Sequence, residues 1–271
     1  MSSPASQPAL RPVSAALPRC ASLRVIAALI LREMATRYGR SPGGYLWAVL
    51  EPVAGIALLV VIFSVGFRSP PLGQNFALFY ASGLLPFLMF TAISGHVAQG
   101  LNQSRPLLAY PRVSFLDALL ARFLLTALTQ GVVSAALLGA ILAFFETRAA
   151  LDPLPLLQAF ALAAALGLGV GLLNTVLISR HPVWQSVWSV LMRPMVLLSG
   201  VIVLQDDLPQ PWRGWLEWNP LVHVSGLARA GFYHGYDPDW VTPLYATGVA
   251  LGAGVFGLLM LTGFHRDLLE R

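Results

Sequence analysis

Long apolar runs dominate this sequence, and each is about as long as the hydrocarbon core of a bilayer is thick. A helix needs roughly 20 apolar residues to cross a membrane. Charged residues make up only 11% of the chain, whereas soluble domains carry about 25%. Because so little charge cannot cover a water-facing surface, we predict an all-α membrane protein with six transmembrane helices. The expected spans are 46–67, 76–98, 119–145, 156–178, 183–204 and 243–264.

The segments outside the spans predict three further features. Residues 1–21 are rich in Pro, Ser and Ala and lack the apolar region of a signal peptide, which is typical of a disordered cytoplasmic tail. Residues 22–44 show apolar side chains at a helical period, which predicts an amphipathic helix in the membrane interface followed by a linker. The alternative, that this stretch begins the first span, is disfavoured by the charges of Arg32, Glu33 and Arg37.

Residues 45–271 would then form the six-span domain. Within it, the segment 205–242 is too apolar for a simple loop, and its apolar stretches are too short to span. It is therefore predicted to hold short re-entrant or interfacial helices between the fifth and sixth spans.

The arginines predict the orientation of the chain. If the six spans are threaded from the N-terminus, twelve of the 17 basic residues fall on the side that holds both termini. Four fall on the opposite side, and Arg193 lies within a span. Cytoplasmic segments carry the excess of positive charge, so both termini are predicted to be cytoplasmic and the segment 205–242 periplasmic.

Several kinds of chemistry are excluded by residues that the sequence lacks. It contains no lysine, so it cannot carry a P-loop ATPase site or a Schiff base. Cys20 is the only cysteine, which rules out an intrachain disulfide and a multi-cysteine metal site. No catalytic constellation and no metal site is predicted. The net charge of +5 is better explained by basic loops beside membrane spans than by nucleic-acid binding.

The fifth expected span carries polar side chains on one side of the helix between residues 185 and 193, which we call the polar stripe. At about 100° per residue its members fall within one arc of the helix. Such a stripe does not face lipid. Two interpretations remain open, namely a water-filled substrate path and a structural pairing of Arg193 with a carboxylate or with backbone carbonyls. The stripe consists of Gln185, Ser186, Ser189 and Arg193, and Trp184 and Trp188 flank it.

Three short motifs carry a resemblance to a known family. They are the run 37–47 (RYGRSPGGYLW), the run 107–111 (LLAYP) and the run 218–223 (WNPLVH). Together with the N-terminal helix they make residues 22–271 resemble the permease subunit of type-2 ATP-binding-cassette exporters. The chain looks most similar to capsular polysaccharide export permeases, next to those for O-antigen and teichoic acid.

The resemblance implies a homodimer in the bacterial inner membrane with a channel at the dimer interface. It also implies two copies of a separate ATPase subunit, which would bind ATP and Mg²⁺, so this chain needs no cofactor of its own. The implied substrate is a lipid-linked, acidic polysaccharide, passed on to periplasmic or outer-membrane export proteins. The implied ATPase-docking residues are Arg32, Arg37, Arg105, Leu107, Tyr110 and Arg112.

The segment 205–242 holds Trp212, Trp215 and Trp218 at every third position. Tryptophans commonly anchor a protein at the membrane–water interface. The alternative is that these rings stack on sugars at the exit of the channel. The sequence leaves both roles open.

Other functions remain as alternatives. A permease for O-antigen, teichoic acid, a drug or haem would share most of these features. A secondary transporter would need carboxylates within the membrane, and only Glu51 lies near a span. An intramembrane enzyme would need a nucleophile or a metal cluster at membrane depth, and the sequence predicts neither.

Overall fold

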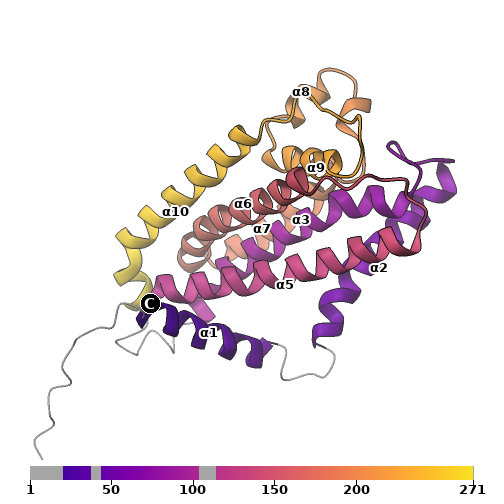
Figure 1. Ribbon diagram of the computed structural model, residues 1–271. Coiled ribbons are helices and arrows are strands. Elements are labelled where there is room, and N and C mark those ends of the chain that lie inside the picture. The colour runs from indigo at the N-terminus through magenta and orange to yellow at the C-terminus, as the bar shows by residue number, and fades with distance from the viewer. Residues whose placement is uncertain (1–20, 38–43, 104–113, 271) are drawn as a thin grey trace, which may run out of the picture.

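The computed structural model describes residues 21–37, 44–103 and 114–270, with the side chains of 21–23, 36–37, 44–45 and 264–270 left out. The described part is helical (Figure 1) and contains no strand. The predicted tail 1–21 therefore lies almost wholly outside the described residues. The helices are α1 (Ala21–Arg37), α2 (Gly44–Gly66), α3 (Phe76–Ala98), α5 (Phe115–Phe144), α6 (Pro153–Arg180), α7 (Val183–Leu198), the 3-10 helix η1 (Gln205–Asp207), α8 (Trp212–Leu216), α9 (Pro220–Ala230) and α10 (Pro243–Glu270).

Five of the described helices are long and apolar enough to cross a membrane. They are α2, α3, α5, α6 and α10, and they match five of the expected spans to within a few residues. Three of these helices begin at side-chain caps, and that of α5 is Ser114, whose side chain accepts from the backbone N–H of Leu116. The Asn75 side chain accepts from the backbone N–H groups of Ala77 and Leu78 at the start of α3, and Asp152 accepts from Leu154 at the start of α6. These caps satisfy N–H groups that the first helical turn leaves free.

The fifth expected span, 183–204, corresponds to α7, which is shorter than predicted. The helix ends at Leu198, and Gly200 follows with a φ of 72°. That left-handed conformation is open to glycine at little cost and ends a helix. Residues 199–204 then run as irregular chain toward η1, buried or half-buried except for Val203. A 16-residue α-helix is about 24 Å long, somewhat less than the thickness of the hydrocarbon core.

The core of the bundle is built around α3. This helix packs against α2, α5, α6 and α9, and most of its residues are buried. Helix α9 is also buried along its length and lies over one end of α3 and α6, beside α8 (Figure 1). We call this the α9 end of the bundle. The opposite end, which carries α1 and the last turns of α10, is called the α1 end (Figure 1).

Small residues bring α6 close to its neighbours. A Cβ atom added to Gly167 would lie 2.9 Å from the Cβ of Ile93 on α3, so the Gly167–Gly171 pair packs as such pairs do in membranes. The second GxxxG pair of the sequence, Gly248 and Gly252 on α10, faces open space instead. Helix α10 turns a different face, which carries Gly254 and Gly257, toward α6.

That close face offers a prediction about stability. A Cβ on Gly169 would lie 2.5 Å from the carbonyl oxygen of Ala250, and a backbone atom cannot move aside as a side chain can. We expect Gly169→Ala to destabilise the protein by about 1–3 kcal/mol, the usual cost of overpacking. Thermal unfolding in detergent measures this loss. Gly252→Ala is the matched control and should unfold at the wild-type temperature; equal melting of both variants would contradict the α6–α10 contact.

Candidate transport surface and coupling contacts

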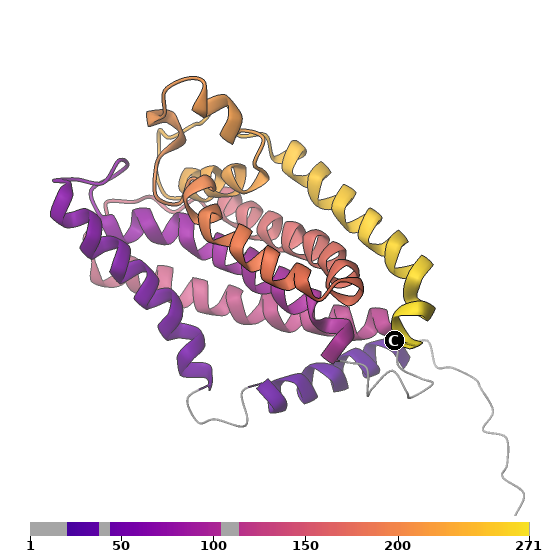
Figure 2. The same cartoon turned by 180° about the vertical axis from the view of Figure 1, so that it is seen from behind.

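The polar stripe lies on the outside of the described molecule. The side chains of Gln185, Ser186, Ser189 and Arg193 are all exposed, and α7 has no buried residue. Figure 2 shows α7 in front of the bundle, on the face opposite to α5. The flanking rings of Trp184 and Trp188 are half-buried, and the Trp184 Nε1 donates to Asn174 Oδ1 on α6 at 2.8 Å. The assignment of these polar side chains to a substrate path stays a prediction.

Arg193 has no ion pair within the part of the chain that the structure describes. Of the two interpretations of the stripe, the structural pairing thus has no partner inside the described monomer. An arginine at membrane depth costs several kcal/mol when lipid surrounds it. The exposed stripe is therefore a surface that water or a second chain must cover.

Side chains of the α9 N-cap and of α9 itself bind the last carbonyl group of α7 and the next one along the chain. Asn219 Nδ2 donates to Leu198 O at 2.8 Å, and Ser225 Oγ donates to Ser199 O at 2.9 Å. The last carbonyls of a helix have no partner within it. These bonds therefore supply what an ending helix lacks, and they fix α7 to the α9 end of the bundle.

Arg229 of α9 is the third side chain that binds a backbone carbonyl in this region, and it is buried. It is only 1% exposed, and its Nη2 donates to Val201 O at 3.0 Å. Its guanidinium lies 4.2 Å from the centre of the Phe79 ring on α3, a favourable cation–π contact. Burial lowers the pKa of Arg229 to about 10, so it stays charged at neutral pH. Arg229 is one of the four arginines that the sequence places on the side opposite to the termini, and nothing local reveals that α9 is buried.

The predicted tryptophan cluster lies at the α9 end and is exposed. Trp212, Trp215 and Trp218 keep most of their surface open. The rings of Trp212 and Trp215 meet edge to face at 5.3 Å, and Trp218 meets Tyr245 of α10 in the same way at 6.5 Å. Exposure of all three rings fits both anchoring and stacking, so the structure leaves both roles open.

The side chain of His223 is neutral and connects the start of α10 to the segment before α9. Its Nδ1 accepts from the backbone N–H of Thr242 at 3.1 Å, so its Nε2 carries the proton and donates to Glu217 O at 2.9 Å. Burial lowers the pKa of His223 below its usual value, which agrees with a neutral ring. Trp240 packs beside this ring and donates its Nε1 to Asp206 Oδ1 at 3.0 Å.

At the α1 end, an ion pair joins α1 to the bundle. Arg122 Nη2 of α5 lies 3.3 Å from both carboxylate oxygens of Glu33 on α1, and its Nη1 donates to Gln103 Oε1 at 2.8 Å. The Arg122 side chain is 8% exposed and that of Glu33 is 25% exposed. The sequence gives no sign that these two charges pair, because they are 89 residues apart.

The predicted ATPase-docking residues are mostly not described. Arg105, Leu107, Tyr110 and Arg112 fall outside the described residues. Arg37 closes α1, with its side chain left out, and Arg32 is exposed on the same helix. The Glu33–Arg122–Gln103 contact, however, connects α1 to the residue after which the undescribed segment 104–113 begins. Among the described residues no group of His, Cys, Asp and Glu side chains could hold a metal ion.

Comparison with known proteins identifies the class. Residues 24–233 match the ABC-2 type transporter family, so this chain belongs to the membrane subunits of ABC-2 type transporters. It is 31% identical over 235 residues to the polysialic acid transport protein KpsM of Escherichia coli, which covers 87% of this chain and 91% of that protein. The resemblance inferred from the sequence motifs is thereby confirmed.

Two further relatives are inner-membrane proteins of capsule polysaccharide export. The chain is 28% identical over 246 residues to CtrC of Neisseria meningitidis, covering 90% of this chain and 92% of that protein. It is 24% identical over 249 residues to BexB of Haemophilus influenzae, with the same coverage. The relatives thus share nearly the whole length of the chain.

Proposed function

We propose that this chain is the channel-forming permease subunit of an ATP-driven exporter that moves lipid-linked, acidic capsular polysaccharide across the bacterial inner membrane. The observation that carries the proposal is the exposed polar stripe of α7 on a chain whose full-length relatives are capsule polysaccharide export proteins. A chain without lysine cannot build a P-loop. Two copies of a separate ATPase subunit would therefore supply ATP hydrolysis.

In this proposal α7 is the fifth of six spans and both termini are cytoplasmic. The α1 end then faces the cytoplasm and the α9 end faces the periplasm. Residues 1–21 would be a tail, residues 22–44 the interface helix and linker, and residues 45–271 the permease domain, with 205–242 as its periplasmic part. Export proteins of the periplasm and outer membrane would receive the polymer there.

A homodimer gives the stripe the environment that it needs. Helix α7 has no buried residue and α2 is mostly exposed. If a second copy faces α7, then Gln185, Ser186, Ser189 and Arg193 would line a water-filled path, with Trp184 and Trp188 at its sides. An arginine suits the passage of an acidic polymer, because it stays charged and donates to carboxylates.

The two ends of the path would carry the remaining sites. Exposed rings at Trp212, Trp215 and Trp218 offer apolar faces to sugar C–H groups at the periplasmic exit. On the cytoplasmic side, α1 and the segment 104–113 would dock on the ATPase through Arg32, Arg37, Arg105, Leu107, Tyr110 and Arg112. The Glu33–Arg122–Gln103 contact would transmit ATPase motion from these parts to α5.

Deleting the gene and restoring it on a plasmid tests the proposed function. We expect the deletion strain to lose surface capsule and to accumulate the polysaccharide inside the cell, and the plasmid to restore export. A Gly252→Ala plasmid is a matched control that should restore it fully, since that position faces open space. Normal capsule in the deletion strain would refute the proposal.

Export of O-antigen is the second candidate, because 88 residues of the chain are 33% identical to the O-antigen export system permease protein RfbA of Myxococcus xanthus. This match covers 32% of the chain and 33% of that protein, so it carries less weight than the full-length relatives. Under this alternative the deletion strain would keep its capsule and lose surface O-antigen. The same strain therefore separates the two candidates.

A further inference from the structure

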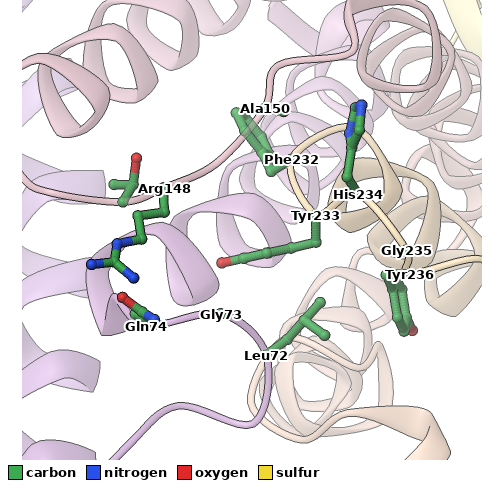
Figure 3. A pocket seen from close by; sticks show the side chains of 11 residues that line it. Leu72, Gly73, Gln74, Arg148, Ala150, Phe232, Tyr233, His234, Gly235 and Tyr236 are labelled. Atoms are coloured by element: carbon green, nitrogen blue, oxygen red, sulfur yellow. The ribbon is translucent and has the colours of Figure 1, made fainter.

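Three loops at the α9 end line a half-open cavity of about 390 Å³ that the proposed transport path does not use. One wall comes from the loop between α2 and α3, a second from the loop between α5 and α6, and a third from the chain that follows α9 (Figure 3). Pockets that take small ligands measure about 300–1,000 Å³. The cavity is therefore large enough for one small molecule or one residue of a polymer.

Backbone contacts fix the walls of this cavity relative to one another. Asp152 N, at the end of the second loop, donates to Gly231 O at the end of α9 at 2.8 Å. Gly73 of the first loop has a φ of 76° and lies so close to the Tyr233 ring that a Cβ atom would overlap it. Only glycine fits there, for both reasons. These two contacts hold the first and second walls against the third.

None of the residues that line the cavity is acidic. Its polar side chains are one arginine and several side chains that can donate hydrogen bonds. Arg148 is exposed and forms no ion pair among the described residues. The hydroxyl of Tyr233 is buried and has no hydrogen-bond partner in the described part of the chain. Figure 3 shows this hydroxyl pointing toward the side of the cavity that holds Arg148 and Gln74.

A buried hydroxyl without a partner is costly, at about 1–3 kcal/mol, and native proteins seldom leave one unsatisfied. Burial also raises the pKa of Tyr233 above its usual value, so the phenol stays protonated and remains a donor at neutral pH. Arg148 adds a second cost, because its φ of 46° is left-handed, the only such value among the described residues other than glycine. Strained backbone of this kind is concentrated at functional sites.

These donors favour an anion, and the other walls favour a sugar ring. Arg148 presents a planar fork of N–H groups, which matches a carboxylate. The rings of Phe232 and Tyr236 also line the cavity, and an aromatic face suits the apolar C–H face of a sugar. A lone inorganic anion would not need these rings.

We propose that this cavity binds an acidic sugar residue of the exported polymer, with its carboxylate held by Arg148 and by the hydroxyl of Tyr233. The inference rests on the proposed function, because it takes the acidic polysaccharide as the substrate. It adds a periplasmic holding site, separate from the stripe of α7, that would retain the emerging polymer.

The test is a titration of the full chain in phosphatidylcholine nanodiscs with glucuronate and with glucose, which differ at C6 by the carboxylate. Binding is followed by ligand-detected NMR. We expect glucuronate to bind at least about tenfold more tightly, the lower limit for hydrogen bonds to a charged group. Arg148→Gln and Tyr233→Phe should each lose most of that preference. Arg68→Gln, which removes an exposed arginine of the first loop outside the cavity, should keep it.

Tyr233→Phe also separates a binding role from a structural one. Because the hydroxyl has no partner among the described residues, removing it should leave the unfolding temperature unchanged or raise it. A lower unfolding temperature together with an unchanged glucuronate preference would overturn the proposal. Equal binding of the two sugars, or a preference that survives Arg148→Gln, would overturn it as well.

A phospholipid headgroup is the competing anion. Native mass spectrometry in nanodiscs that contain phosphatidylglycerol detects it: bound lipid that disappears in Arg148→Gln, without any preference for glucuronate, would assign the cavity to lipid and overturn the sugar site. None of these binding results depends on the deletion strain. If deletion abolishes capsule export and glucuronate does not bind, the cavity inference alone has failed.

Discussion

Replacing Arg193 with alanine is expected to reduce polysaccharide export by about tenfold or more while the subunit still assembles with its partners. The guanidinium is exposed on α7 and unpaired among the described residues, so its removal breaks no ion pair that holds the described fold together. A hydrogen bond to a charged group contributes about 1.5–3 kcal/mol, and 1.4 kcal/mol corresponds to a factor of ten. Surface capsule, quantified against the amount of permease in the membrane, measures the effect.

Two controls test the reason for this loss. Arg193→Lys keeps the positive charge and should retain part of the export. Leu191→Ala shortens an exposed side chain on the opposite face of the same helix and should leave export unchanged. If Arg193→Ala removes the protein from the membrane, the arginine is instead a structural group paired across the dimer. Full export by Arg193→Ala would remove the stripe from the transport path.

Replacing Arg122 with glutamine is expected to release α1 from the bundle and to uncouple ATP hydrolysis from transport. Arg122 is nearly buried and binds Glu33 and Gln103, so the change removes the ion pair that joins α5 to α1. Removing a charged hydrogen-bond partner costs about 2 kcal/mol, which raises the equilibrium constant for local opening roughly 30-fold. Hydrogen exchange of α1 measures the opening, and the ATPase activity of the complex measures the coupling.

A charge exchange provides the decisive control for this pair. The double variant Glu33→Arg with Arg122→Glu restores opposite charges and should recover part of the protection of α1 that each single variant loses. Arg24→Gln removes an exposed charge from the same helix and should change neither quantity. Additive losses in the double variant would show that the two side chains act independently.

Features that depend on local sequence could be predicted well. A run of about 20 apolar residues must form a helix in a membrane, since no other local structure satisfies its backbone there. Five expected spans accordingly match α2, α3, α5, α6 and α10. The polar stripe was also predictable, because residues 185–193 belong to one helix and their angular positions follow from its period. The family followed from short motifs that stand close together in the chain.

Features that depend on which helices meet were not predictable. Helix α7 ends at Leu198 because Gly200 turns the chain and Asn219 and Ser225 of α9 bind the freed carbonyls. Gly169 packs on α10 whereas Gly248 faces open space, and a GxxxG spacing alone does not tell which side of a helix finds a neighbour.

The candidate sites divide in the same way. Composition and span length, which depend on neighbouring residues, predicted a membrane protein. The helical period predicted the stripe, and the spacing of the tryptophans marked them as candidates. Only the tertiary structure paired Glu33 with Arg122 and brought Arg148 and Tyr233 to one cavity. Those contacts join residues that are 85 or more positions apart. Their geometry depends on how whole helices pack, and no local pattern in the sequence records it.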